Sequence, residues 1–334
     1  MSDFRINNIT DRTGDSGPVI AGVSTVSSTG AFTVPVGPTE MRGGRGRAVV
    51  VLGATPSVVD TMDYFETATA GNAIDFGNAS VARYQNGFGG MASGTRGVFQ
   101  GGASPSSNIM EYVTISSSGG ANDFGDHHRG VTNGNGQCAN GTRGLLAGGY
   151  LAPLSYSTID FITIATTGST SEFGEFDDGS TGGYSPMASP TRAVFARAGQ
   201  NINFINFTSG GKTQIFGDMR GDSRDGHIAS CSNSTRGIMA GGEAPSRVNT
   251  ITFITLATLG NGTDFGDLLA VRNDHDAVSS STRGFFVAGS TGSTTNLIDF
   301  VTISTTGNAS DFGDLTQART QPSSCSDVHG GLGD

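Results

Sequence analysis

The chain has 334 residues and a formal net charge of −10, and charged residues make up only 14% of it. Nucleic-acid phosphates and anionic lipid headgroups repel an acidic chain, so we expect no nucleic-acid partner and no binding to a charged membrane surface. No stretch approaches 18 consecutive apolar residues, so the sequence also predicts no membrane insertion.

The first 44 residues differ from the rest of the chain. They contain GPVIAGVSTVSSTGAFTVPVG followed by GGRGR, which predicts a short β-hairpin or extended arm and then a Pro/Gly-rich linker. The N-terminus lacks a basic region followed by an apolar run, so no secretory signal peptide is predicted. We expect two parts: an arm and linker over residues 1–44, and a repeat domain over residues 45–334.

Three anchors recur in the repeat domain. The first is a Thr-Arg-Gly-apolar run such as TRGLLAGG at 142, the second is a β-branched and aromatic strand such as IDFITIATTG at 159, and the third is Phe-Gly followed by an acid or amide. The anchor arginines are Arg47, Arg96, Arg143, Arg192, Arg236 and Arg283. Their spacing of 44 to 49 residues, with four short β-segments per unit, is typical of propeller blades and close to the Kelch period of ~50.

The sequence therefore predicts an all-β fold, a β-propeller of six four-stranded blades, which we number by these arginines. Blade one lacks a first strand before Arg47, whereas ARTQPSSCSDVHGG at the C-terminus resembles a spare first strand. We expect the C-terminal strand to complete blade one and close the ring, which hides the sheet edges. Seven blades are the alternative, because residues 24–30 resemble residues 301–307.

The three cysteines, Cys138, Cys231 and Cys325, occupy one repeat position, five residues before the anchor arginine or its C-terminal equivalent. Copies in different blades are expected to lie too far apart for a disulfide. We interpret them as buried free thiols, which fits synthesis in a reducing compartment. A metal or redox site is the alternative.

The repeated charged residues are interpreted as scaffold, because an active site needs one special place rather than six equal ones. An arginine fork can join one strand or blade to the next through carboxylates or main-chain carbonyls. We assign this role to the six anchor arginines and group with them the acids after Phe-Gly: Asp126, Asp218, Asp267 and Asp314. A functional ring around the central channel is the alternative.

Three loose clusters contain possible metal ligands: Asp126-His127-His128, then Asp222, Asp225 and His227, and finally Asp274-His275-Asp276. None has an established ligand spacing, so we interpret all three as solvated turns, with a bound cation as the alternative. The sequence contains no Gly-x-Ser-x-Gly, Walker A, His-Glu-x-x-His or EF-hand motif. The prediction is therefore a non-enzymatic protein with no cofactor and no metal.

The loops between the second and third strands vary most and should share one face of the ring. Blade three has the longest loop, with Tyr150, Leu151, Leu154 and Tyr156, and the loop of blade five carries Arg247. Binding residues concentrate in such loops, and exposed tyrosines make good contacts. These five residues are our candidate binding residues; loop drift without function is the alternative.

The N-terminal GPVIAGVSTVSSTGAFTVPVG, combined with repeated TRGxxxGG, IDFITIATTGN and DFGD, resembles virion structural proteins of tailed marine phages, including phages of cyanobacteria. The blades alone resemble divergent Kelch-type repeats. The resemblance covers nearly the whole chain, although blade one has Asn78 after Phe-Gly and blade four is short.

This resemblance implies a structural component of the virion, made in the host cytoplasm. It would be a capsid decoration or a tail or fibre component that contacts other virion proteins through residues 1–44. The alternative is a propeller whose blade loops bind a host surface receptor or glycan during adsorption. A third hypothesis, a polysaccharide depolymerase, needs a unique pair of carboxylates in one cleft, and the sequence offers no pair that stands out.

Overall fold

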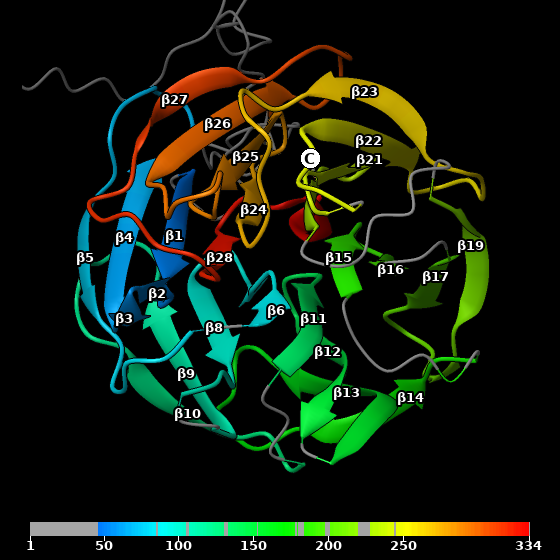
Figure 1. The fold of residues 1–334 in the computed structure, drawn as a ribbon. Coiled ribbons are helices and arrows are strands. Elements are labelled where there is room, and N and C mark those ends of the chain that lie inside the picture. The colour runs from blue at the N-terminus through cyan, green and yellow to red at the C-terminus, as the bar shows by residue number, and fades with distance from the viewer. Residues whose placement is uncertain are drawn as a thin grey trace, which may run out of the picture. The chain divides into compact units, whose positions relative to one another are not determined.

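The computed structural model describes residues 46–84, 86–104, 107–129, 133–151, 153–177, 179, 184–197, 201–219, 228–243 and 245–333. All of them belong to one compact unit. Six β-sheets surround a central axis (Figure 1), and the one helical element among these residues is a 3-10 turn, η1 (Gly330–Leu332). The predicted six-bladed β-propeller is confirmed.

Each blade has four antiparallel strands, of which the first lies innermost and the fourth outermost. Blade one consists of β28 (Ser323–Ser326), β1 (Arg47–Val51), β4 (Thr61–Glu66) and β5 (Ile74–Asn78); blade two of β7 (Met91–Ala92), β8 (Arg96–Gln100), β9 (Ile109–Thr114) and β10 (Asn122–Asp126); blade three of β11 (Asn133–Ala139), β12 (Arg143–Leu151), β13 (Leu154–Thr163) and β14 (Ser171–Glu175). Blade four consists of β15 (Tyr184–Ala188), β16 (Arg192–Arg197), β17 (Asn201–Asn206) and β19 (Gln214–Asp218); blade five of β20 (Ala229–Ser232), β21 (Arg236–Ala240), β22 (Thr250–Thr255) and β23 (Thr263–Asp267); blade six of β24 (Asp276–Ser279), β25 (Arg283–Val287), β26 (Leu297–Thr302) and β27 (Ser310–Asp314).

Four short strands are additions to this plan. Blade three gains β6 (Asn86–Phe88), parallel to β11 on its inner edge, and β18 (Gly211–Lys212), parallel to β14 on its outer edge. A small hairpin of β2 (Ala54–Thr55) and β3 (Ser57–Val58) extends from the loop between the second and third strands of blade one.

Blade one combines the two ends of the described chain. Strand β28 pairs antiparallel with β1, with Cys325 opposite Val49. The Arg47 N–H also donates to Asp327 Oδ1 at 2.7 Å. The C-terminal strand thus takes the place predicted for it. The predicted arm and linker over residues 1–44, and the segment 24–30 that suggested a seventh blade, lie outside the described residues.

The hydrophobic core lies between neighbouring blades. One cluster, for example, joins Val49 and Phe76 of blade one to Phe99 and Val113 of blade two. A strand packed on both faces needs apolar residues at consecutive positions rather than in strict alternation. This requirement explains why apolar residues fall on both faces of the third strands.

The Phe-Gly anchor forms a β-bulge in every blade. In blade one, Gly77 pairs with Met62 and Asp75 pairs with Asp63, so Phe76 is the extra residue and its ring enters the core. A side chain at Gly77 would collide with the main chain at Gly119 in the turn of blade two. The glycine is therefore required by the close approach of the next blade.

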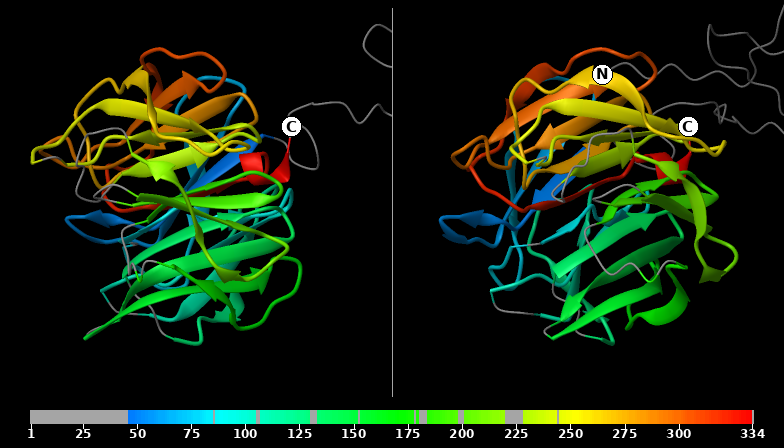
Figure 2. Two further views of the ribbon diagram at one scale, coloured as in Figure 1. Left: turned by 90° about the vertical axis from the view of Figure 1, so that its right-hand side faces the viewer. Right: turned by 45° about the vertical axis from the view of Figure 1, so that its right-hand side comes forward.

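Alternating strand direction gives the ring two faces. The loops between second and third strands, and the crossovers from a fourth strand to the next blade, lie on one face, which we call the hairpin face. The other turns lie on the opposite face, which we call the turn face. The chain enters at Gly46, before a second strand, and ends after a first strand, so both ends of the described chain lie on the turn face. Figure 2 shows the β2–β3 hairpin and η1 on opposite sides of the ring.

Candidate functional site

The six anchor arginines join neighbouring blades. In each blade the guanidinium donates to a main-chain carbonyl just beyond the third strand of the next blade, as Arg236 does to Ile303 at 2.8 Å. The same guanidinium lies 4.1–5.2 Å from the centre of an aromatic ring of its own third strand. Arg47, Arg96, Arg143, Arg192, Arg236 and Arg283 bond in this way to Ile115, Ile164, Phe207, Leu256, Ile303 and Thr67, respectively. Since all six share these two contacts, the contacts mark no single site.

The repeated aspartates contribute their main chain to the contact between blades. The Asp126 carbonyl accepts a hydrogen bond of 3.1 Å from the Thr170 N–H in the next blade. The corresponding pairs are Asp218 with Gly262, Asp267 with Ala309, and Asp314 with Ala73. The side chains of Asp126 and Asp218 are exposed, and those of Asp267 and Asp314 are half-buried. These bonds cover the outer edge of each blade.

The three cysteines lie beside a narrow central cavity of about 50 Å³. They are free and buried, and burial raises the pKa of each thiol, to about 12 for Cys231. At neutral pH they are protonated, and a thiol in this form is a poor nucleophile and metal ligand. At the turn face His329 Nε2 donates to the Ala92 carbonyl at 2.8 Å, and η1 packs against β11, β15 and β20. His329 therefore lines this cavity, and η1 lies against the first strands of three blades.

Three blade junctions contain a buried ion pair, which we call a clasp. An arginine on the crossover reaches a carboxylate on the third strand of the next blade, and both side chains are at most 3% exposed. The pairs are Arg319 with Asp63 at 2.7 Å, Arg83 with Glu111 at 2.6 Å, and Arg272 with Asp299 at 2.6 Å. Each of these arginines stands seven residues after the phenylalanine of Phe-Gly. This pairing was not predicted, although the spacing of seven residues is visible in the sequence.

Blade three has the acid on its third strand but lacks the arginine that pairs with it in a clasp. Its third strand carries a buried carboxylate, Asp160, but the residue seven positions after Phe124 is Val131, not arginine. Blades four and five also have no arginine seven positions after the preceding Phe-Gly, and they carry the neutral Asn203 and Thr252 on the third strand. At this position of the third strand, Asp160 is thus the one acid without a clasp arginine in the sequence.

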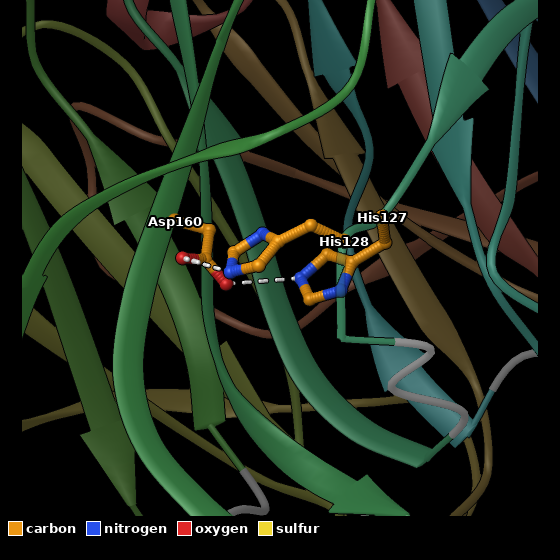
Figure 3. A group of neighbouring side chains, drawn as sticks. All are labelled: His127, His128 and Asp160. Atoms are coloured by element: carbon orange, nitrogen blue, oxygen red, sulfur yellow. Dashed lines mark ion pairs between the residues drawn. The ribbon is translucent and has the colours of Figure 1, made fainter.

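Two histidines approach this carboxylate instead (Figure 3). His127 Nε2 lies 3.1 Å from Asp160 Oδ2, and both side chains are 2% exposed. His128 Nε2 lies 3.9 Å from Asp160 Oδ1, and its side chain is 36% exposed. The position of His127, three residues after Phe124, is apolar and buried in the other five repeats: Ala79, Phe176, Met219, Leu268 and Leu315. A histidine there is specific to this junction.

The surrounding groups fix the two imidazoles. His127 Nδ1 accepts a hydrogen bond of 3.2 Å from the Arg129 N–H, so Nε2 carries the proton that faces Asp160. His128 Nδ1 lies 2.7 Å from the Thr170 hydroxyl. Asp160 Oδ1 has no hydrogen-bond partner among the described residues. The site therefore contains a buried carboxylate oxygen whose hydrogen-bonding capacity is unused.

Arg129 lies at the edge of this cluster rather than within it. Its guanidinium bonds Glu172 at 2.8 Å and also contacts Thr158, whereas Asp160 Oδ1 is 3.8 Å away. Burial lowers the pKa of His128, an effect that Arg129 and His127 reinforce and Asp160 opposes. His128 is therefore neutral at pH 7. We compared the His, Cys, Asp and Glu side chains in the part of the chain that the structure describes. His127, His128 and Asp160 are the one group of three among them whose possible ligand atoms all lie within 4.8 Å of one another.

The candidate binding residues of blade three lie close to this cluster. Strands β12 and β13 continue to the tip of their hairpin, where Leu151 pairs with Leu154. Tyr150 is 41% exposed and Leu154 is 57% exposed. Tyr156 points inward to the Arg129 guanidinium, which lies 6.0 Å from its ring centre. The tip therefore belongs to the blade that supplies Asp160, and His127 reaches that blade from the crossover after β10.

Arg247 of blade five, unlike the exposed Tyr150 and Leu154 of blade three, forms a hydrogen bond within the ring. Its Nε donates to Asn273 Oδ1 at 2.8 Å, and its side chain is 35% exposed. It thus ties its own loop to the next crossover, and the structure does not bring it together with the blade-three residues.

The solvated-turn interpretation is wrong for His127, His275 and Asp276, whereas Asp126 and His128 are exposed. His127 is buried, and so are His275 and Asp276, because the crossovers and first strands of the blades carry them into the interior. Burial raises the pKa of Asp276 to about 6, although Ser324 and the Gly89 N–H donate to it. The remaining cluster, residues 222–227, lies outside the described residues.

No protein-family model matches the sequence, and no curated protein matches it either. Within the described ranges, no helix has the length and apolar character needed to cross a bilayer. The geometry of the propeller and the resemblance of its motifs are therefore the basis on which a function can be assigned.

Proposed function

We propose that this chain is a non-enzymatic structural protein of a tailed-phage virion, a capsid decoration or a tail or fibre component. Residues 1–44 attach it to other virion proteins, and the propeller is displayed outward. The proposal starts from the resemblance of the N-terminal motif and the repeats to such proteins.

The observation that supports it best is the placement of the chain ends. The described chain begins and ends on the turn face, beside the Arg47–Asp327 contact. The loops that differ most between blades lie on the hairpin face. A segment that precedes Gly46 therefore joins the ring on the turn face, and attachment there leaves the irregular loops free for contact.

The test is deletion of residues 1–44 from the phage gene. We expect purified particles to lack the truncated protein by mass spectrometry, because the attachment segment is gone. The isolated truncated ring should keep the circular dichroism spectrum and the unfolding temperature of the full chain. Incorporation of the folded truncated ring at the normal level would refute attachment through residues 1–44.

The second candidate function is binding of a host surface receptor or glycan. Its support is the exposed tip of the β12–β13 hairpin, where Tyr150 and Leu154 present apolar surface to solvent. Aromatic and aliphatic side chains at a protruding tip are suited to contact with a partner.

We expect the double variant Tyr150→Ser with Leu154→Ser to reduce adsorption to host cells about tenfold or more while assembly continues. Leu259→Ser is a matched control, because Leu259 is 61% exposed but lies in the turn between β22 and β23, on the turn face. Equal adsorption of the double variant, the control and the parent phage would exclude the hairpin tip as a receptor contact.

A further inference from the structure

We propose that His127, His128 and Asp160 bind one divalent transition-metal ion of the Zn²⁺, Co²⁺ or Ni²⁺ class. The ion would join the crossover after β10 to strand β13 and so take the place of the missing clasp arginine. This site is independent of the virion assignment.

The first argument is electrostatic. A carboxylate buried to the extent of Asp160 is costly without a cation or a full set of hydrogen bonds. The clasp arginine supplies the cation at three junctions, and the acid is replaced by a neutral residue at two. Blade three keeps the acid. His127 donates one hydrogen bond to Oδ2, whereas Oδ1 accepts none and, apart from His128 at 3.9 Å, has only a long ion pair of 3.8 Å with Arg129.

The second argument is geometric. In a tetrahedral site with metal–ligand bonds of about 2.0–2.2 Å, the ligand atoms lie about 3.3–3.6 Å apart. His127 Nε2 is 3.1 Å from Asp160 Oδ2, and His128 Nε2 is 3.9 Å from Oδ1. All three ligand atoms fall within 4.8 Å. The two separations lie on either side of the tetrahedral value.

The third argument is the support around the ligands. Metal-binding histidines usually have their second nitrogen hydrogen-bonded, which fixes the ring. The Thr170 hydroxyl does this for His128 Nδ1. At His127 the ring proton moves from Nε2 to Nδ1 when the metal binds, and the Arg129 N–H then gives up its bond to Nδ1. No proton is released by this step, because the imidazole only changes its tautomer.

The donor set decides the class of ion. Two imidazole nitrogens and one carboxylate oxygen suit Zn²⁺, Co²⁺ and Ni²⁺, whereas Ca²⁺ and Mg²⁺ require mostly oxygen ligands. Because His128 is 36% exposed, water can reach the remaining coordination positions. The positive charge of Arg129, 3.8 Å from Asp160 Oδ1, lowers the affinity and makes a removable ion more suitable than a permanent one.

The experiment uses the full chain without an affinity tag, treated with a chelator and then dialysed. Calorimetric titration with Zn²⁺ should give one ion per chain, and Co²⁺ should produce visible absorption bands of a site with nitrogen and oxygen ligands. Millimolar Mg²⁺ should not compete. The thermal unfolding temperature should rise on addition of Zn²⁺.

Two variants remove ligands. His128→Ala changes a partly exposed ring and leaves the core packing intact, and Asp160→Asn keeps the shape of the side chain. Both should abolish saturable binding and the thermal shift. The matched control is His227→Ala, which removes a histidine from the cluster at residues 222–227 and should bind as the parent does.

The proposal fails if the parent chain shows no saturable binding. It also fails if His128→Ala binds as well as the parent, or if His227→Ala alone loses the ion. Should Asp160→Asn not fold, as judged by circular dichroism, the result with His128→Ala decides.

Discussion

At the scale of single residues, the three clasp arginines are buried, so the loss of an ion-pair partner is expected to cost more stability for them than for an exposed charge. Arg83, Arg272 and Arg319 are at most 1% exposed in their side chains. Burial lowers the pKa of Arg272 and raises the pKa of Asp299, while each group favours the charged form of the other. Such a pair contributes little over an apolar pair of the same size, but removal of one partner leaves a buried charge uncompensated.

We therefore predict that Arg272→Ala lowers the free energy of unfolding by about 3–5 kcal/mol, measured by urea denaturation. The double variant Arg272→Met with Asp299→Leu should recover most of this loss, since no charge then remains buried. Lys212→Ala, on an exposed ammonium near Glu175 and Asp177, should leave the unfolding midpoint unchanged. A loss in the double variant equal to that of Arg272→Ala would contradict the explanation.

At the scale of elements, His329 at the start of the turn η1 lines the central cavity and bonds to the Ala92 carbonyl. Burial lowers the pKa of His329 to about 4, although its bond to the Ala92 carbonyl favours the charged form. The unfolded chain, with an ordinary histidine pKa of about 6.5, takes up this proton first as the pH falls. The contribution of His329 to stability is therefore complete above about pH 6.5 and is lost between there and about pH 4.

We predict that His329→Gln weakens the acid destabilisation of the protein by about 3 kcal/mol between pH 7 and pH 4. The measurement is the free energy of unfolding in urea at several pH values, for the parent and the variant. Parallel curves for the two proteins would show that His329 is protonated in the folded ring.

Asp276 acts in the opposite sense over the same pH range. Its pKa is raised to about 6, so the folded state binds a proton before the unfolded state does, and this group favours folding as the pH falls through 6. Asp276→Asn should therefore show a steeper loss of stability with acid than the parent. A shallower loss in Asp276→Asn would mean that the carboxyl is not buried in its neutral form.

At the scale of the whole molecule, ring closure depends on strand β28. It supplies the innermost strand of blade one, and its Cys325 packs beside Val49 and Phe99 in the core between blades one and two. Without it, the edge of β1 and the apolar surface of two junctions would face water.

Truncation after Gln321 should therefore abolish cooperative thermal unfolding and cause the chain to aggregate, as seen by calorimetry and sedimentation. A synthetic peptide of residues 322–334 should restore a cooperative transition when it is added in excess. Truncation after Val328, which keeps β28 and removes only the C-terminal turn, is the control and should fold. A cooperative, monomeric Gln321 truncation would show that the ring closes without β28.

Much of the architecture was predictable because the same motifs recur at the same positions of each repeat. The anchor arginines, the Phe-Gly motifs and the spare C-terminal strand each occur in equivalent positions, so the blade number and the closing strand followed from their spacing. The exposure of Tyr150 and Leu154 was also predictable, because their loop differs in length from its counterparts. Such features depend on residues close in sequence or in the same repeat position.

The cluster at blade three could not be predicted in the same way. His127 and Asp160 are 33 positions apart and belong to different blades, so only the packing of one blade on the next brings them together. His127 looked like part of a solvated turn, because burial depends on what covers the crossover and not on its composition. The sequence by itself determined the ring and its repeated contacts. The tertiary structure alone decided which charged groups enter the interior, since contact between blades sets the solvation of each side chain.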